Sequence, residues 1–284
     1  MSNSVLIIGN KGYIGSALYK YLIDRDCIVQ GVDLRDGIDC RDLSDKFISD
    51  FDAVVHLGGL SNVADCTREF YEVFQCNLLP HVEFLHKLRP DQKYIYASTA
   101  SVYGGNSRNR RSMENDFIFC PNHSYDATKM MMDIAAQTSG KQYYGLRFAT
   151  VCGPSSVMRM TMLNAMVENA MEKGEISITN PNINRPILGI NDLTRAIESI
   201  IAGGDNRGIY NLASWNCVVA DMAEAVIKFF VSKGKSIISH IASEPSVYDF
   251  AIDTSKFKAT YNFSFKETPQ TVIGKLYDHY NKTL

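Results

Sequence analysis

The sequence predicts an α/β fold, with a doubly wound parallel sheet and a smaller C-terminal region. Short, continuously apolar runs alternate with stretches that carry apolar residues at helical spacing. This alternation is typical of a parallel sheet covered by helices on both faces. It holds up to about Gly153, after which the segments become Met-rich or polar. We therefore expect one large sheet domain and a cap that returns to it.

The first part of the chain contains the runs that define the sheet. Five short apolar runs are predicted strands: 4–8, 28–32, 53–57, 94–97 and 145–148. Three stretches with apolar residues at helical spacing are predicted helices: 14–24, 68–88 and 125–138. Strand and helix thus follow one another in the order of a doubly wound sheet.

In the second part of the chain, strands and helices no longer alternate regularly. Four segments have helical spacing: 158–171, 192–202, 221–230 and 268–280. Three shorter segments are predicted strands: 176–178, 208–212 and 237–241. The methionines in this part are expected to fill the core, because the flexible Met side chain adapts to irregular gaps.

Composition narrows the classes of protein to consider. The chain of 284 residues is 45% hydrophobic and 21% charged, with a net charge of -2, so nothing favours nucleic acid or an anionic membrane as a partner. No apolar run reaches the roughly 18 residues that span a bilayer. The seven cysteines are scattered without metal-ligand spacing, which predicts reduced thiols and no metal site. With no leader pattern at the first residues, we expect a soluble, cytoplasmic protein.

A glycine-rich turn between the first strand and the first helix predicts a dinucleotide site. Gly9, Gly12 and Gly15 permit a tight turn and a close approach of backbone N–H groups to a pyrophosphate. Asp33 follows the second strand, 18 positions after Gly15, where a carboxylate binds an adenosine ribose diol. A carboxylate repels a 2′-phosphate, which favours NAD over NADP, although the nearby Arg35 leaves NADP open. Residues 1–153 are thus a predicted NAD-binding, Rossmann-type domain, joined again by a strand and helix near 190–213, and residues 154–284 are mainly a substrate-binding region.

A hydroxyl-rich strand end and a Tyr-Lys pair predict the chemistry. The strand at 94–97 runs into Ser98 and Thr99, and Tyr125 and Lys129 lie four positions apart on the next helix. Residues at this spacing share one helix face. A lysine ammonium there stabilises a phenolate, which makes a phenol of pKa about 10 a useful base near neutrality. This arrangement suits removal of a hydroxyl proton while hydride leaves the same carbon.

Taken together, these motifs resemble the extended short-chain dehydrogenases/reductases, in particular the NAD-dependent nucleotide-sugar epimerases and dehydratases. The resemblance spans nearly the whole chain. It comprises the glycine motif, His56-Leu57-Gly58-Gly59, Asn77, the set Thr99/Tyr125/Lys129, and the blocks Arg147–Pro154 and Arg185–Asp192. The runs ASTASVYGGN from Ala97 and SYDATK from Ser124 are most similar to the UDP-glucuronate and UDP-galactose type of 4-epimerase.

The resemblance implies a role for each matched position. Tyr125 is expected to take the proton, Lys129 to lower the pKa of Tyr125 and bind the nicotinamide ribose, and Thr99 to bind the reacting oxygen. The implied cofactor-binding residues are Gly9, Gly12, Tyr13, Ile14, Gly15, Asp33, Asp39, Cys40, Leu57, Gly58, Gly59, Asn77 and Lys129. The implied substrate-binding residues are Ser61, Ser98, Thr150, Arg159 and Arg185.

The residues that follow Thr99 separate the reactions of this superfamily. Dehydratases of the matching pattern carry an Asp and a Glu there, and related decarboxylases keep the Glu, whereas this chain has Ala100 and Ser101. We therefore expect 4-epimerisation through a transient 4-keto sugar. An NAD(P)-dependent reductase or dehydrogenase is the alternative, and a catalytically silent dinucleotide-binding regulatory protein is a third reading.

Three departures from the family pattern concern the substrate. Thr150 replaces an Asn, Cys152 replaces a Tyr, and the stretch Glu244–Asp249 lacks a second diphosphate-binding Arg. Charge pairing with a diphosphate then depends on Arg185, with Arg159 as a second candidate, or else the substrate is not a usual nucleotide sugar. The resemblance also implies a homodimer formed by helices near 70–88 and 125–138.

Overall fold

The fold is described from a computed structural model, which covers residues 4–61, 70–104, 110–116, 123–245 and 248–283. Its central element is a six-stranded sheet in the order β2-β1-β3-β4-β6-β10, and every neighbouring pair is parallel. The strands are β1 (Ser4–Ile8), β2 (Ile28–Val32), β3 (Ala53–His56), β4 (Lys93–Thr99), β6 (Gln142–Phe148) and β10 (Gly208–Leu212). The predicted doubly wound parallel sheet is confirmed.

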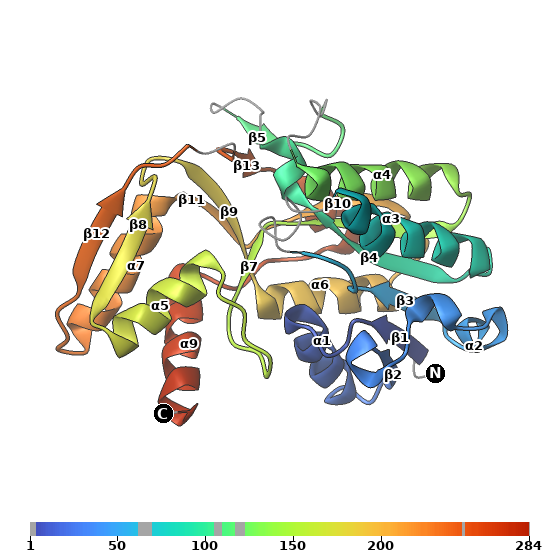
Figure 1. Cartoon of the computed structure of the whole chain (residues 1–284), viewed down its shortest axis with the longest axis horizontal. Coiled ribbons are helices and arrows are strands. Elements are labelled where there is room, and N and C mark those ends of the chain that lie inside the picture. Colours follow the sequence, from blue (N-terminus) through green and yellow to red (C-terminus); the bar gives the residue numbers. More distant parts are fainter. Residues whose placement is uncertain (1–3, 62–69, 105–109, 117–122, 246–247, 284) are drawn as a thin grey trace.

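Helices cover both faces of this sheet (Figure 1). Helices α1 (Tyr13–Ile23) and α6 (Ile190–Ala202) lie on one face, and α3 (Phe70–Lys87) and α4 (Ser124–Thr138) lie on the other. The alternation of side chains along a strand explains why β1 is apolar throughout: Val5 and Ile7 join the core beneath α1 and α6, while Leu6 and Ile8 join the core beneath α3. Residues 68 and 69 of the helix expected at 68–88 lie outside the described residues.

The C-terminal lobe is a second layer of helices and short strands at the side of the sheet (Figure 1). It contains α5 (Met162–Glu172), α7 (Val219–Ser232) and α9 (Pro269–Thr283), with β8 (Glu175–Thr179) paired in parallel to β12 (Ile238–Ala242). Its own apolar core includes Met166, Val226 and Leu276. Strand β10 and helix α6 belong instead to the large sheet domain, and the division at residue 153 stays a prediction.

Several elements differ from the sequence-based expectation. A three-stranded sheet of β7 (Thr150–Cys152), β9 (Asn184–Gly189) and β11 (Trp215–Val218) was not expected, and it lies between the two lobes. Helix α5 begins at Met162 and not at 158, because Thr161 has extended backbone angles and precedes the first helical residue. Further short elements not expected are α2 (Asp45–Ser49), β5 (Arg111–Ser112), β13 (Ala251–Ile252) and α8 (Ser255–Tyr261).

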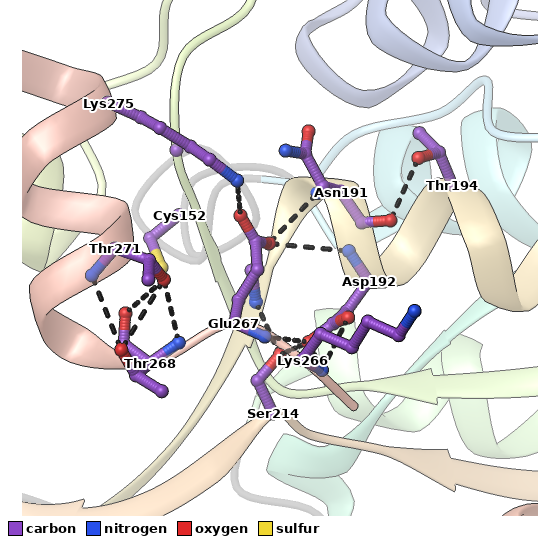
Figure 2. Close-up of polar contacts among 12 residues, drawn as sticks. Cys152, Asn191, Asp192, Thr194, Ser214, Lys266, Glu267, Thr268, Thr271 and Lys275 are labelled. Carbon is purple, nitrogen blue, oxygen red and sulfur yellow. Dashed lines mark hydrogen bonds and ion pairs between the residues drawn. The ribbon is translucent and has the colours of Figure 1, made fainter. Parts of the chain in front are cut away.

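A buried polar cluster joins the start of α6 to the segment before α9 (Figure 2). The Glu267 carboxylate accepts hydrogen bonds from the backbone N–H of Asn191 at 3.0 Å and of Asp192 at 3.3 Å. The Asp192 carboxylate in turn accepts from the backbone N–H of Lys266 and of Glu267. Each carboxylate thus satisfies backbone donors of the other segment, which fixes the lobe against the sheet domain.

Candidate active site

A cavity of about 940 Å³ opens at the carboxyl ends of the central strands. It is lined by residues at or just beyond the ends of β1, β2, β3, β4 and β6, among them Gly9, Asp33, Leu57, Thr99 and Phe148. Strands β2 and β3 lie on opposite sides of β1, so the cavity lies at the topological switch point of the sheet. Open α/β sheets bind their ligands at this position.

The glycine turn has room for backbone and for little else. Gly9 has a positive φ of 84°, and a Cβ on Gly15 would lie 2.0 Å from the Gly9 carbonyl oxygen. A side chain at Gly15 would push the turn open, and one at Gly9 would meet the Gly58 backbone after β3. Gly12 is the N-cap of α1 and no side chain caps this helix, which leaves its first N–H groups and positive end to a ligand. These features fit the pyrophosphate of a dinucleotide.

Asp33 is held rigidly at the end of β2. Its carboxylate accepts the backbone N–H of Lys11 and of Arg35, each at 3.0 Å. Arg35 also donates to the Lys11 carbonyl, and Lys11 forms an ion pair with Asp36. Each carboxylate oxygen of Asp33 retains acceptor capacity for a ribose hydroxyl. Arg35 lines the same part of the cavity.

Two further predicted cofactor residues, Asp39 and Cys40, line the cavity near Asp33. Hydrogen bonds from the Arg41 side chain hold the pKa of Asp39 below its ordinary value, so Asp39 is ionised and paired. Burial raises the pKa of the Cys40 thiol to about 11, so this thiol is uncharged near pH 7 where it lines the cavity.

The three predicted catalytic residues, Thr99, Tyr125 and Lys129, line this cavity together. Thr99 is the last residue of β4, whereas Tyr125 and Lys129 come from α4, which packs against β4. The Lys129 Nζ donates to the Ala97 carbonyl at 2.8 Å and lies 5.9 Å from the centre of the Tyr125 ring. The sequence spacing therefore brings the phenol and the ammonium to one face of α4, at the end of β4.

Behind Lys129 lies a buried chain of rings. His56 Nδ1 lies 2.8 Å from the Tyr94 hydroxyl, which lies 3.0 Å from His81 Nδ1, and His81 Nε2 lies 2.9 Å from the Met132 carbonyl. Burial, aided by the charge of Lys129, lowers the pKa of both histidines to about 3. Since a carbonyl only accepts, the proton direction follows: His81 donates to Met132, Tyr94 to His81, and His56 to Tyr94. Both rings are neutral near pH 7, so neither histidine adds a second positive charge beneath Lys129.

A second polar chain, which sequence reasoning missed, leads from Thr99 to the C-terminal lobe. The Thr99 hydroxyl lies 2.7 Å from that of Ser101, Ser101 donates to the Asp126 carboxylate, and Tyr248 donates to the same carboxylate at 2.8 Å. Thr99, Ser101 and Tyr248 line the cavity, and Asp126 is buried behind them. The only sequence signal was an acid next to Tyr125. The contact with Tyr248 spans 122 residues and left no local pattern.

All five predicted substrate residues line the cavity, and Ser98 directly precedes Thr99 on β4: Ser61, Ser98, Thr150, Arg159 and Arg185. The Arg159 guanidinium donates to the hydroxyl and the carbonyl of Ser61. The Arg185 guanidinium donates to the Tyr248 carbonyl and lies 5.8 Å from the centre of the Tyr248 ring. Two arginines from separate segments therefore face this half of the cavity.

Two predicted cofactor residues use their side chains away from the cavity. Asn77 is buried and does not line the cavity: its amide accepts from Leu60 N–H at 2.8 Å and donates to the Leu60 carbonyl and to Thr128. The Tyr13 hydroxyl donates to the Gly153 carbonyl at 2.7 Å and accepts from Asn164. Asn77 thus holds the loop after β3 against α4, and Tyr13 holds the glycine turn against the start of the C-terminal lobe.

The described parts of the chain contain no group of three or more acidic, histidine or cysteine side chains placed to hold a metal ion. Among the same residues, none of the helices combines the length and apolarity that crossing a bilayer requires.

Known proteins resemble the chain over its full length. UDP-glucuronic acid 4-epimerase from Bacillus cereus, in complex with UDP-glucuronic acid and NAD, superimposes with a TM-score of 0.84 at 19% identity, covering 99% of this chain and 100% of that chain. RMD from Pseudomonas aeruginosa, complexed with NADPH, gives a TM-score of 0.82 at 16% identity and covers 100% of both chains. By sequence, GDP-6-deoxy-D-mannose reductase of Pseudomonas aeruginosa is 21% identical over 229 residues, 75% of each protein.

A family model described as NAD dependent epimerase/dehydratase family matches residues 5–213. The matched region holds the glycine turn, Asp33 and the set Thr99/Tyr125/Lys129. The chain belongs to the NAD dependent epimerase/dehydratase family and is an enzyme of the extended short-chain dehydrogenase/reductase type.

Proposed function

We propose that the protein is an NAD-dependent 4-epimerase of a nucleotide sugar, with a transient 4-keto intermediate. The observation that carries this proposal is the composition of the reaction end of the cavity. Thr99, Tyr125 and Lys129 line it, and the two positions after Thr99 are the buried Ala100 and the hydroxyl residue Ser101. Among the described lining residues, the carboxylates Asp33 and Asp39 belong to the adenosine end. Redox chemistry without a following elimination is what such a reaction end supports.

The roles of the chain's own residues follow from their positions. Lys129 favours the phenolate of Tyr125, which takes the proton of the sugar 4-hydroxyl. Thr99 hydrogen-bonds the reacting oxygen and fixes its position relative to Tyr125. The glycine turn and Asp33 would hold NAD, which would supply the acceptor for the hydride of the same carbon and the source for its return to the opposite face of the 4-keto sugar. His56 and His81 are neutral beneath Lys129 and therefore add no positive charge to that of Lys129.

The substrate half of the cavity favours an anionic ligand. Arg159 and Arg185 face it from two separate segments, and Lys129 adds a third positive charge toward the reaction end. Guanidinium groups bind phosphate oxygens in paired geometry. We therefore propose that Arg159 and Arg185 hold a nucleoside diphosphate between them; the Bacillus cereus structure named above contains UDP-glucuronic acid.

Asp33 supports NAD as the cofactor, because a carboxylate at the ribose position repels a 2′-phosphate. The second candidate function, an NAD(P)-dependent reductase, is favoured by one observation: Arg35 lines the cavity beside Asp33 and could face a 2′-phosphate. The RMD structure named above holds NADPH. Exchangeable cofactor and a single hydride transfer would distinguish this function from epimerisation.

We further propose a homodimer in which α3 and α4 of two subunits pack together. Helices α3 and α4 lie side by side on the outer face of the sheet (Figure 1). Large apolar side chains on both are exposed: Leu79, Val82, Met131 and Ile134. Burying such a surface against a second copy would remove it from water.

The first experiment incubates the purified protein with UDP-, GDP-, dTDP- and CDP-sugars, without added cofactor, and reads the products by NMR. Conversion of one sugar to its C4 epimer is the expected result. Conversion that needs added NAD(H) or NADP(H) would replace the epimerase by the reductase. The Tyr125→Phe variant should lose turnover while it still binds NAD, and retained turnover would remove Tyr125 as the base.

A further inference from the structure

The loop between β7 and α5, residues 153–161, forms one wall of the cavity through its second half, Val157 to Thr161. This half carries Arg159, whose guanidinium is proposed to hold the substrate diphosphate. Some N–H groups of the guanidinium donate to the hydroxyl and the carbonyl of Ser61, and the others remain available to a ligand. The direction in which they point depends on how the backbone of the loop is held.

One buried side chain bonds to both ends of this loop. Asn164 lies in the first turn of α5 and is fully buried. Its Oδ1 accepts the backbone N–H of Gly153 at 3.0 Å. Its Nδ2 donates to the Arg159 carbonyl at 2.9 Å and to the Tyr13 hydroxyl at 3.1 Å. Because a backbone N–H only donates and a carbonyl only accepts, these contacts fix the orientation of the amide.

The polar side chain at this position is an exception on the buried face of α5. The other buried residues of the helix are apolar: Leu163, Met166, Val167 and Ala170. An amide among them costs desolvation free energy unless its polar atoms have partners. The partners of Asn164 are the loop and Tyr13, so the amide stabilises the loop and the helix gains nothing from it.

The first half of the loop has anchors besides Asn164. The Ser155 hydroxyl donates to the Tyr13 carbonyl at the start of α1 and lies 2.9 Å from the Ser16 hydroxyl. Gly153 has a φ of 123°, and a Cβ there would lie 2.8 Å from Cγ2 of Ile190, so only glycine fits. This half is therefore fixed against α1 and α6.

The second half depends on Asn164. The Arg159 carbonyl accepts the Thr161 N–H at 2.9 Å, which closes a tight turn within the loop. Met160, at the middle of this turn, is 54% exposed and gives it little packing. The bond from Asn164 ties the same carbonyl to α5 and, through Tyr13, to α1. Loss of the amide would free the peptide group that directs the Arg159 side chain.

We propose that Asn164 is a positioning residue for the substrate: it holds the Arg159 peptide group so that the guanidinium faces the cavity before the ligand arrives. The proposal rests on the proposed function for the chemistry of the ligand, a nucleoside diphosphate. The hydrogen bonds that carry it are properties of this chain alone. A long side chain that becomes ordered only on binding weakens a complex by about two- to tenfold. A loop fixed beforehand avoids that loss.

The first test needs no ligand. Amide hydrogen exchange is compared between the wild type and Asn164→Leu, in which a side chain of similar shape lacks the amide. The Thr161 N–H does not bond to Asn164, yet it should exchange several-fold faster, because its acceptor, the Arg159 carbonyl, is no longer held. Asn169→Leu, in the last turn of α5, should leave this exchange unchanged.

Unchanged exchange of the Thr161 N–H in Asn164→Leu would overturn the proposal. Asn164→Ala removes the same amide without adding bulk, and it replaces the leucine variant if that variant does not fold.

The second test is a double-mutant cycle on ligand affinity. Isothermal titration gives the dissociation constants of UDP, GDP, dTDP and CDP, and the tightest of them is used. Asn164→Leu should raise this constant by about two- to tenfold. The same substitution in an Arg159→Ala background should have no further effect, because Asn164 acts through Arg159. An equal effect in both backgrounds would show a merely structural role and overturn the proposal.

The outcomes separate this proposal from the proposed function. Weaker binding in Arg159→Ala, with unchanged binding in Asn164→Leu, would overturn the positioning role and leave the proposed function standing. Unchanged binding in Arg159→Ala would remove Arg159 as the phosphate ligand and this proposal with it. If none of the four nucleotides binds to the wild type, the nucleotide-sugar substrate and the positioning role are both overturned.

Discussion

Asp192 and Glu267 exchange backbone hydrogen bonds: each carboxylate accepts N–H groups from the segment that carries the other (Figure 2). Both side chains are buried, and Lys275 forms an ion pair with Glu267 at 2.8 Å. A Cβ on Gly189 would lie 1.9 Å from a Glu267 carboxylate oxygen, so the residue before α6 must be glycine for Glu267 to reach the helix start. The contact is therefore specified from three separate parts of the sequence.

Glu267→Gln should destabilise the protein by about 1.5–3 kcal/mol, the range for hydrogen bonds to a charged group. The amide has one acceptor oxygen in place of two and no charge for Lys275. The midpoint of urea unfolding measures the effect. Glu224→Gln is the control, because Glu224 pairs with Lys228 in an exposed contact on α7. Equal midpoints for the two variants would contradict a role for Glu267 in joining the lobes.

Gly15→Ala should weaken NAD binding strongly. The new Cβ would lie 2.0 Å from the Gly9 carbonyl oxygen, so the turn must open and its N–H groups lose their positions. Isothermal titration with NAD should show a dissociation constant raised by more than about tenfold, the factor for 1.4 kcal/mol. Gly204→Ala is the control, since a Cβ there meets nothing within 4 Å. Unchanged affinity in Gly15→Ala would place the cofactor elsewhere.

Asp33→Asn should narrow the preference for NAD over NADP. The substitution removes the charge that repels a 2′-phosphate and weakens the contacts with a ribose diol. The ratio of the two dissociation constants, measured for wild type and variant, tests this directly. Asp36→Asn serves as the control, because Asp36 pairs with Lys11 through a partly exposed contact nearby. If the ratio of the two dissociation constants changed by the same factor in both variants, the loss of any nearby negative charge would explain the change, and Asp33 would have no specific role.

Stability should fall as the pH drops below about 6.5. The unfolded chain protonates its histidines near that pH, whereas burial holds the pKa of His56 and His81 at about 3 in the folded state. Their contribution is fully present above pH 6.5 and is lost toward pH 3, at up to about 1.4 kcal/mol per pH unit for each histidine.

Unfolding free energy measured against pH provides the check. His81→Gln should reduce the slope in this window by up to one proton, because of the two buried histidines His56 alone then remains. His86→Gln, an exposed histidine on the same helix, should leave the slope unchanged. Parallel curves for the wild type and His81→Gln would show that His81 titrates normally.

Ile134→Glu should convert a dimer into a monomer. Ile134 is 52% exposed on α4, and a carboxylate there would be buried against its own copy in the proposed interface. Light scattering at micromolar concentration gives the mass. Ile238→Glu is the control, since Ile238 is comparably exposed on β12 of the other lobe. A monomeric wild type would remove the dimer proposal.

The sequence predicted the large sheet well because its inner strands are buried on both faces and therefore apolar throughout. β1, β2 and β10 have the predicted bounds, 4–8, 28–32 and 208–212. The sheet of β7, β9 and β11 escaped prediction because its strands are short and only partly apolar. β9 contains Arg185 and Pro186, which break an apolar run. The glycine turn, Asp33 and the Tyr125–Lys129 pair were predictable because each is a local pattern with its own chemistry.

Contacts between distant segments were the part that no pattern revealed. The sequence predicted no role for Asp126, which is a helix residue next to Tyr125. It predicted none for Tyr248 either, in a stretch that differs from the family pattern by its missing arginine. Their hydrogen bond depends on how the segment after β12 returns to α4, which is decided by tertiary packing. The role of Asn77 was equally hidden from the sequence, because its amide bonds to the backbone of Leu60, a residue 17 positions away.

Tyr13 stands at the first residue of α1, and its hydroxyl holds Gly153 and Asn164 at the start of the C-terminal lobe. Its carbonyl accepts the Ser155 hydroxyl at 2.9 Å. The turn that would hold the pyrophosphate and the segment that leads to the substrate wall are thus parts of one bonded unit. Whatever free energy the cofactor adds to substrate binding, the substrate must return to cofactor binding in equal measure. Tyr13 joins the two segments between which that coupling would act.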